Sequence, residues 1–206
     1  MILCLIRHGE TVYNIDERMQ GVRDIDLSPR GREEAILLGS RLRESGLHPR
    51  RVYSSPVKRA IETARLLGYP APIIPLNGFK ARALGELEGL TRTEIALKYP
   101  GAWAKLRHWD WVPPGAHESL RDLFRRATKE MPDILQREQE AGLTLVVTHS
   151  GVLEAVVRGW LSLEPHQELP FPLKNAGALL FHENGQGAWI PEKTIAVGKN
   201  ETVDYA

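Results

Sequence analysis

The sequence has a single cysteine, no long apolar run and almost no net charge, and each absence excludes something. With only Cys4, no disulfide bond can form within the chain, and its apolar neighbours predict a core residue. That apolar run, residues 2–6, is too short for a membrane span or a signal peptide, and no basic leader precedes it. The net charge of +1 gives no overall basic field to attract nucleic acid or an anionic membrane. We therefore expect a cytoplasmic protein that binds neither, with anion binding only where arginines or lysines gather locally.

Length and composition predict one folded domain. Of the 206 residues, 42% are hydrophobic and 26% are charged, close to the average of globular proteins. A chain of this length can bury a substantial core, so we expect a single domain over residues 1–206. Residues 93–116 are rich in tryptophan and proline and indicate an excursion from the main sheet with short helical pieces. We expect a lid or insertion at about residues 78–118.

Short apolar and β-branched runs predict the strands. The expected strands cover residues 2–6, 51–54, 73–74, 143–147, 178–181 and 188–190. The last two are expected to pair around residues 184–187. The tail after Pro191 is polar, and we expect it to be loosely held.

Start signals and helical periodicity predict the helices. A good N-cap followed by proline occurs at Ser28-Pro29 and again at Ser55-Pro56. A long polar-faced helix should be kinked at Pro132. The expected helices cover residues 28–46, 55–68, 117–140 and about 152–161. Strands that alternate with helices favour a three-layer α/β fold, a mostly parallel sheet with helices on both faces.

Three segments share one layout, in which a strand is followed by a turn with a basic or imidazole side chain and then by a helix. The turns carry Arg7-His8-Gly9, Ser55 to Arg59, and His149-Ser150-Gly151. In open α/β sheets ligands bind at the carboxyl ends of the strands, so all three turns should face the same edge. Helix N-termini there present free N–H groups and a partial positive charge, which suit a phosphate.

The side chains at this edge fit phosphoryl transfer. Arg7 and Arg59 can each grip phosphate oxygens with a two-pronged guanidinium, and positioning and positive charge supply most of the catalysis of this reaction. A neutral imidazole nitrogen can act as the nucleophile. A histidine at a strand end is often only structural, but His8 and His149 together offer a nucleophile and a group that stabilises the transferring phosphoryl. The chemistry requires no metal ion and no cofactor.

These turns belong to a longer pattern of motifs. Residues 5–11 read Leu-Ile-Arg-His-Gly-Glu-Thr, and Asn14 follows. Further motifs are Arg18-Met19-Gln20-Gly21, Asp26-Leu27-Ser28 with Gly31, Ser54-Ser55-Pro56 through Arg59 to Ala64, Gly85 with Glu88-Gly89, Pro113-Pro114-Gly115 with Glu118-Ser119, and residues 146–151, Val-Val-Thr-His-Ser-Gly. Over roughly residues 1–185 the chain resembles the histidine phosphatase superfamily, in its phosphoglycerate mutase-like branch.

The resemblance implies a role for each matching residue. His8 would be the phosphorylated nucleophile, and Arg7, Arg59 and His149 would form the phosphate pocket with it. Residues along the substrate, or donating backbone N–H groups to it, would be Asn14, Gln20, Gly21, Ser150 and Gly151.

One position departs from the family pattern. A carboxylate that protonates the leaving oxygen and later activates water normally lies a few residues before Gly85, and counting back from Glu88 without gaps places Ala81 there. Alanine cannot transfer a proton, a step typically worth about 10²–10⁴-fold in rate. Three explanations compete. Another acid substitutes, namely Glu86, Glu88 or Glu118, with Glu86 as the first candidate. Alternatively the register is shifted by one or more residues, or the protein is a weak or altered catalyst.

The leading functional hypothesis is a phosphatase that hydrolyses a small phosphorylated metabolite through a phosphohistidine at His8. A mutase, which returns the phosphoryl group to a second hydroxyl of its substrate, is the alternative, although dedicated mutases of the family tend to be longer. A phosphate-binding relative with weakened catalysis is the third hypothesis, motivated by Ala81. A homodimer is possible, and the sequence does not identify the substrate.

Overall fold

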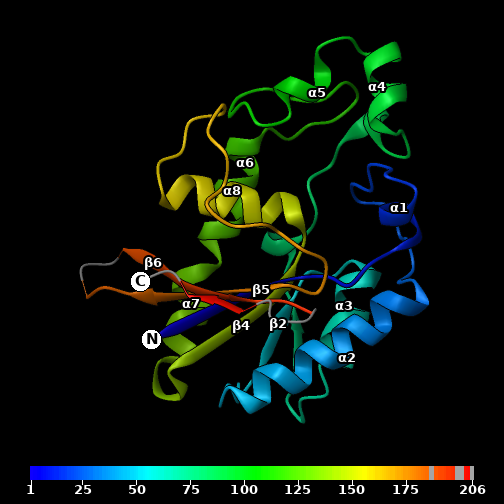
Figure 1. Ribbon diagram of the computed structural model, residues 1–206. Coiled ribbons are helices and arrows are strands. Elements are labelled where there is room, and N and C mark those ends of the chain that lie inside the picture. The colour runs from blue at the N-terminus through cyan, green and yellow to red at the C-terminus, as the bar shows by residue number, and fades with distance from the viewer. Residues whose placement is uncertain (186–187, 198–201, 205–206) are drawn as a thin grey trace.

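One sheet of seven strands lies between two layers of helices (Figure 1). The computed structural model describes residues 1–185, 188–197 and 202–204, and every count below refers to these residues. The strands are β1 (Ile2–Arg7), β2 (Val52–Ser54), β3 (Ile73–Pro75), β4 (Leu143–Thr148), β5 (Ala178–Glu183), β6 (Trp189–Ile195) and β7 (Thr202–Asp204). The helices are α1 (Val12–Ile15), α2 (Pro29–Glu44), α3 (Lys58–Leu66), α4 (Arg92–Lys98), α5 (Ala102–Lys105), α6 (Leu120–Lys129), α7 (Met131–Arg137) and α8 (Ser150–Trp160), with 3₁₀ turns η1 (Asn77–Phe79), η2 (Gly85–Leu87) and η3 (Gln139–Ala141).

The sheet is mixed, in the strand order β3-β2-β4-β1-β5-β6-β7. The first four strands in this order are parallel, and β1 pairs with β4 from Ile2 opposite Leu143 to Arg7 opposite Thr148. The last three strands continue the sheet with antiparallel pairing. The predicted α/β fold class is therefore confirmed, and so is the pairing of the two late strands. The expectation of a mostly parallel sheet is wrong, because three of the six described strand pairs are antiparallel. Part of their connecting turn, residues 186–187, lies outside the described residues.

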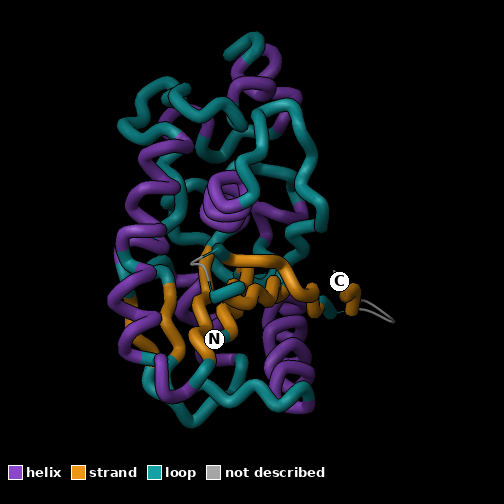
Figure 2. The backbone as a smooth tube through the Cα atoms, turned by 90° about the vertical axis from the view of Figure 1, so that its left-hand side faces the viewer, coloured by secondary structure: helices purple, strands orange, loops and turns teal. Residues whose placement is uncertain are grey.

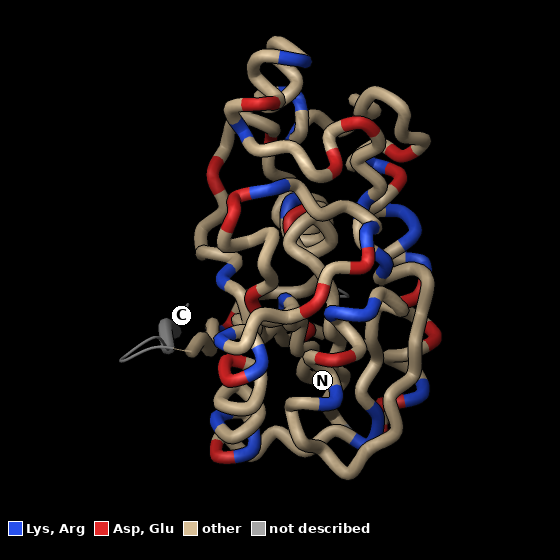
Figure 3. Tube along the Cα trace, turned by 90° about the vertical axis from the view of Figure 1, so that its right-hand side faces the viewer, with Lys and Arg blue, Asp and Glu red and all other residues tan. Residues whose placement is uncertain are grey.

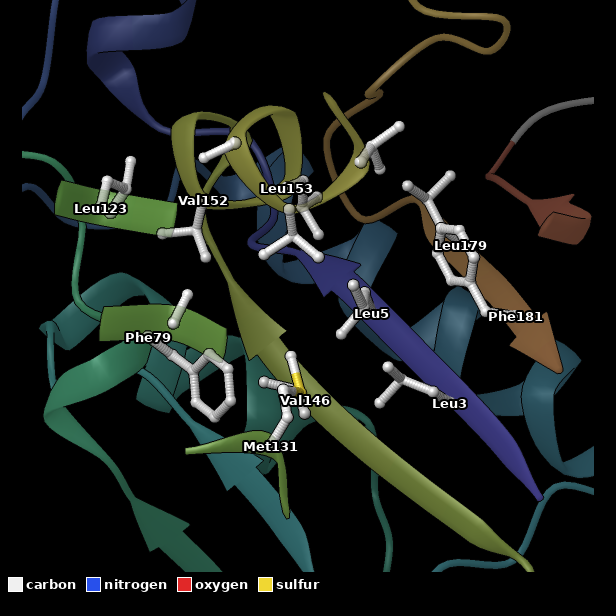
Figure 4. Close-up of a cluster of buried hydrophobic side chains, with 14 of the residues drawn as sticks. Leu3, Leu5, Phe79, Leu123, Met131, Val146, Val152, Leu153, Leu179 and Phe181 are labelled. Atoms are coloured by element: carbon white, nitrogen blue, oxygen red, sulfur yellow. The ribbon is translucent and has the colours of Figure 1, made fainter. Parts of the chain in front are cut away.

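Each face of the sheet packs against its own helices, as the side view in Figure 2 shows. Leu3 and Leu5 point to the face covered by α6, α7 and α8, where the cluster of Figure 4 lies. Cys4 and Ile6 point to the opposite face and pack against α2 and α3. Burial raises the pKa of the Cys4 thiol to about 12, as expected for a core residue. Strand β1 is apolar without alternation because both of its faces are covered.

One of the two predicted helix starts is correct and the other is wrong. Ser28 caps α2, because its Oγ accepts a hydrogen bond from the Gly31 N–H (2.9 Å) and Pro29 occupies the first helical position. The next helix does not begin at Pro56. It begins at Lys58, and Val57 is its N-cap without a side-chain bond. The Ser55 hydroxyl accepts a hydrogen bond from the Val57 N–H (3.2 Å) in the turn before this helix.

The helix expected over residues 117–140, with a kink at Pro132, is divided into two consecutive helices that meet at Glu130. Ser119, with Asp122, forms the capping box of α6, which starts at Leu120. The helical path is interrupted at Glu130, and α7 follows with Pro132 in its first turn, a position where proline costs no hydrogen bond. The 3₁₀ turn η3 follows α7 and leads to β4.

The prediction of a loosely held tail after Pro191 fails for the residues that are described. β6 runs to Ile195 and its neighbour β7 pairs with it antiparallel. Ile195 is buried in the cluster under α2, so the end of β6 contributes to the core.

Helix α8 starts at Ser150, two residues before the start at residue 152 that the sequence predicts.

Residues 78–118 lie beside α1 at one end of the molecule (Figure 1) and bury a small cluster of their own. Its centre is Leu84, Leu87, Ile95 and Ala102. Lys and Arg alternate with Asp and Glu along the trace, as Figure 3 shows for one face. Within the described residues no helix is long and apolar enough to cross a membrane.

Candidate active site

The carboxyl ends of β1, β2 and β4 meet at the floor of one cavity. The backbone N–H of His8 donates to the Thr148 carbonyl (3.0 Å), and that of Ser55 donates to the Val147 carbonyl (2.8 Å), so the three turns are tied together just past the strands. The cavity above them has a volume of about 470 Å³. Its lining includes Arg7, His8, Asn14, Gln20, Gly21, Arg59, His149, Ser150 and Gly151. The structure thus brings every residue proposed from the sequence for the phosphate and substrate contacts to one place.

His8 is held with one ring nitrogen protonated and with a lone pair on the other. Its Nδ1 lies 2.8 Å from the Gly9 carbonyl, an oxygen that can only accept, so the ring proton belongs on Nδ1. Nε2 therefore carries a lone pair, and it accepts a hydrogen bond from Arg59 Nε (3.2 Å). Burial, helped by the charges of Arg59 and Arg7, holds the pKa of His8 well below its usual range. The ring is consequently a neutral base at pH 7.

His149 lies against His8 from the end of β4. The two rings meet edge to face with 5.2 Å between their centroids. Nε2 of His149 lies 2.7 Å from the Ser55 hydroxyl, which already accepts from the Val57 N–H and so has its own proton to donate. When the Ser55 hydroxyl donates to Nε2, the His149 ring proton lies on Nδ1, a buried nitrogen without a partner among the described residues. Burial first, then the charge of Arg59, holds the pKa of His149 well below its usual range.

Two guanidinium groups complete the floor. Arg59 donates from Nη1 to the Arg23 carbonyl and from Nη2 to the Gly21 carbonyl, both at 2.8 Å. Arg7 donates from Nη1 to the Leu173 carbonyl (2.6 Å), while its buried Nε has no partner among the described residues. Burial lowers the pKa of both arginines to about 10, which leaves both charged at neutral pH. The Nε–H of Arg7 and the ring Nδ1 of His149, both buried without partners among the described residues, fit an oxyanion.

The turn after β1 packs closely on α2 and α3. A Cβ on Gly9 would lie 2.3 Å from the Gly31 carbonyl oxygen, so a side chain there would push α2 away. The Gly9 N–H donates to Thr63 Oγ1 (3.1 Å) on α3. This close contact fixes the position of His8, the residue that precedes Gly9.

The remaining predicted contacts lie around this floor. The Asn14 side-chain oxygen accepts from Thr11 and from Asn175 Nδ2 (2.9 Å), which leaves its NH₂ group as the part that can bind a substrate. Gln20 has a buried Oε1 without a partner among the described residues. Ser150 starts α8, whose first N–H groups have no side-chain cap.

The Gln20–Gly21 loop is fastened by Glu88. Gly21 has a φ of +53°, and a Cβ there would lie 2.0 Å from Glu88 Oε1. The same oxygen accepts from the N–H of Val22 (3.1 Å) and of Leu84 (3.0 Å). Glu88 therefore holds in place the loop whose carbonyls anchor Arg59.

The carboxylates suggested as substitutes for Ala81 do not line the cavity, whereas Ala81 itself does. Glu86 is exposed and accepts from the Tyr99 hydroxyl. Glu118 forms a two-pronged ion pair with Arg126, with 3.0 Å between Nη2 and Oε2. The ungapped count that puts Ala81 in the place of the family's acid is thus consistent with the position of Ala81 in the cavity wall.

The cavity wall also includes residues that the sequence reasoning did not single out. They are Tyr13, Glu17, Arg82, Leu84, Arg92, Leu106, Leu120 and Glu154. Several belong to the segment 78–118, where Trp103 lies under the Arg92 guanidinium, 5.2 Å from the ring centroid. No motif marks these positions, because their place depends on how the segment folds back over the strand ends. His117 is exposed and does not line the cavity.

Comparisons with known proteins agree with this geometry. The family model described as histidine phosphatase superfamily (branch 1) matches residues 3–193. The chain belongs to the histidine phosphatase superfamily. Among the residues the structure describes, no three His, Cys, Asp or Glu side chains are grouped as a metal ion would require.

Relatives within the superfamily include both phosphatases and mutases. The chain is 34% identical over 159 residues to the metal-independent phosphoserine phosphatase of Arabidopsis thaliana, covering 75% of this chain and 66% of that protein, just under two thirds. It is 31% identical to the 2,3-bisphosphoglycerate-dependent phosphoglycerate mutase of Cytophaga hutchinsonii, over 80% of this chain and 79% of that protein. The structure of a mycobacterial glucosyl-3-phosphoglycerate phosphatase with VO3 matches 92% of this chain and 96% of its own, with a TM-score of 0.80 and 28% identity.

Proposed function

We propose that this protein is a phosphatase that hydrolyses a small phosphomonoester through a phosphohistidine at His8. The observation that carries the proposal is the unprotonated Nε2 of His8 on the floor of a cavity with two buried guanidiniums. A nucleophile, a charged cradle for the phosphoryl oxygens and a second imidazole donor are what this reaction needs. Relatives named as phosphatases support the same reading.

The reaction runs in two half-reactions. In the first, the lone pair of His8 Nε2 attacks phosphorus, and the bond from phosphorus to the ester oxygen breaks. Arg7, Arg59 and the Nδ1–H of His149 bind the phosphoryl oxygens, while the Gly9 carbonyl supports the charge that develops on the ring. In the second, water attacks phosphorus, and His8 leaves as a neutral ring.

The finer parts of the proposal are a cytoplasmic location, action without a metal ion, and a wall at residues 78–118 that determines the substrate. The wall is supported by Ala81, Arg92 and Trp103, which line the cavity from that segment. Mutase activity is the second candidate, because relatives named as mutases match this chain as well.

His8→Ala is the first test. With p-nitrophenyl phosphate in the presence of EDTA, the native protein should release phosphate, and the variant should lose more than about 1000-fold in kcat. His48→Ala, at an exposed histidine away from the cavity, is the matched control and should be unchanged. Phosphate release that survives His8→Ala would refute the nucleophile.

3-Phosphoglycerate distinguishes the alternatives. Phosphate release from it supports the phosphatase, and interconversion of phosphoglycerates without release supports the mutase. Binding of inorganic phosphate without turnover of either compound would indicate a phosphate-binding protein.

A further inference from the structure

Among the residues that the structure describes, none offers the cavity a ready proton for a leaving oxygen. The cavity lining includes guanidiniums, a neutral second imidazole and the methyl group of Ala81, with polar but non-acidic side chains at Asn14, Gln20 and Ser150. An alkoxide is a poor leaving group unless an acid protonates it as the bond to phosphorus breaks. A guanidinium binds and stabilises an anion but does not give up its proton in a protein.

The acidic side chains that do line the cavity are Glu17 and Glu154. Glu154 forms ion pairs with two arginines, since its Oε1 lies 3.1 Å from Arg158 Nε and 3.2 Å from Arg107 Nε. Glu17 is exposed and follows α1 near the surface. The Tyr13 phenol also lines the wall, but a phenol is a far weaker acid than a carboxyl group.

We infer that the substrates of this site are phosphoryl compounds whose leaving oxygen departs as a stable anion, such as a phenolate or a carboxylate. This inference rests on the proposed function and names its substrate class. Such a leaving group needs no proton at the moment of bond cleavage, so a site that supplies only positive charge and a nucleophile is sufficient. Simple alkyl phosphates are poor substrates of the same site.

The first step balances without an acid. The neutral His8 ring and the ester dianion give a phosphohistidine that keeps its Nδ1 proton, together with the free leaving-group anion. Water then attacks phosphorus, and its two protons leave with the product as dihydrogen phosphate while His8 regains its neutral form. The leaving group of this second step is His8 itself, so its rate is the same for every substrate.

A series of aryl and alkyl phosphates tests the inference in the intact protein. We expect kcat/KM to fall steeply as the pKa of the leaving alcohol rises, because the first step has no proton donor. Among the reactive aryl esters we expect kcat to be constant, with a burst of phenol equal to the enzyme concentration, since breakdown of the phosphohistidine is then rate-limiting.

Ala81→Glu should restore an acid at the reacting end. We expect it to raise kcat/KM for alkyl phosphates by about 10–100-fold and to make kcat/KM depend less on the pKa of the leaving alcohol. This gain is smaller than the factor of about 10²–10⁴ that a fully positioned acid typically supplies. Ala81→Gln, equal in size but without a proton to transfer, should not do so. Ala83→Glu, two residues along and outside the cavity wall, is the control for added charge.

The outcomes separate the inference from the proposed function. Equal rates on aryl and alkyl esters in the native protein, still dependent on His8, would overturn the inference alone. A steeper dependence in Glu17→Gln, Glu154→Gln or Tyr13→Phe would also overturn it by revealing the acid. Absence of any His8-dependent release from the whole series would refute the proposed function. The native series is decisive by itself if Ala81→Glu does not fold.

Discussion

At the scale of single residues, burial and neighbouring positive charge determine the protonation state of the two histidines at the site. His8 and His149 are 3% and 4% exposed, and each is surrounded by positive charge. A protonated imidazole would be a third cation beside Arg7 and Arg59, so the fold selects the neutral rings. A neutral ring at position 8 is also what nucleophilic attack requires.

This selection predicts how stability depends on pH. In the unfolded chain both rings bind protons near pH 6.5, whereas in the folded protein their lowered pKa values keep them neutral. The unfolded state thus binds more protons below that pH, and the free energy of unfolding should decrease as the pH falls, by up to about 1.4 kcal/mol per pH unit for each ring.

Urea unfolding between pH 7.5 and 5.5, in buffer without phosphate, measures this effect. The double variant His8→Asn with His149→Asn should lose less stability over this range than the native protein. A variant with the exposed His48 and His182 replaced by asparagine should behave like the native protein. Parallel pH dependences for all three would contradict the buried, neutral rings.

At the scale of elements, the arginine cradle depends on a loop that is not part of any strand or helix. Two backbone carbonyls of the loop of residues 20–23 accept hydrogen bonds from Arg59. The loop is held in turn by Glu88, next to η2, which accepts a hydrogen bond from the Val22 N–H. The position of the Arg59 side chain on α3 is therefore coupled to the turn before residue 90.

Replacing Glu88 separates this positioning role from proton transfer. Glu88→Ala leaves the N–H groups of Val22 and Leu84 without their acceptor, so we expect a loss of about 1 kcal/mol or more in unfolding free energy and a raised KM. Glu88→Gln keeps the accepting oxygen and should change both much less. Loss of kcat in Glu88→Gln with native stability would identify Glu88 as a proton donor instead.

The helix ends show why local sequence signals succeed or fail. Ser28-Pro29 starts a helix because the Ser28 hydroxyl is available to cap the Gly31 N–H. Ser55-Pro56 carries the same signal, but the Ser55 hydroxyl accepts from the Val57 N–H (3.2 Å) in a turn, and the helix starts at Lys58. The same serine–proline pair therefore fits a turn as well as a helix start, and its neighbours in the sequence do not distinguish the two.

At the scale of the whole molecule, the sequence predicted the parts of the site that follow from parallel-sheet geometry. Strands β1, β2 and β4 are adjacent and parallel, so the turns after them meet at one edge wherever the rest of the chain goes. The wall from Ala81 to Leu106 could not be predicted in the same way. Its place depends on a separate apolar cluster around Leu87 and Ile95, which no periodic pattern connects to the strand ends.

The position of the phosphoryl group on the protein is the most direct measurement of the central claim. The native protein is mixed rapidly with an aryl phosphate and quenched in alkali, which preserves phosphohistidine, and the modified peptide is identified by mass spectrometry. We predict a phosphoryl group on His8, at a level that rises and falls with turnover. A phosphoryl group on His149 or on any other residue, or none during turnover, would contradict the claim.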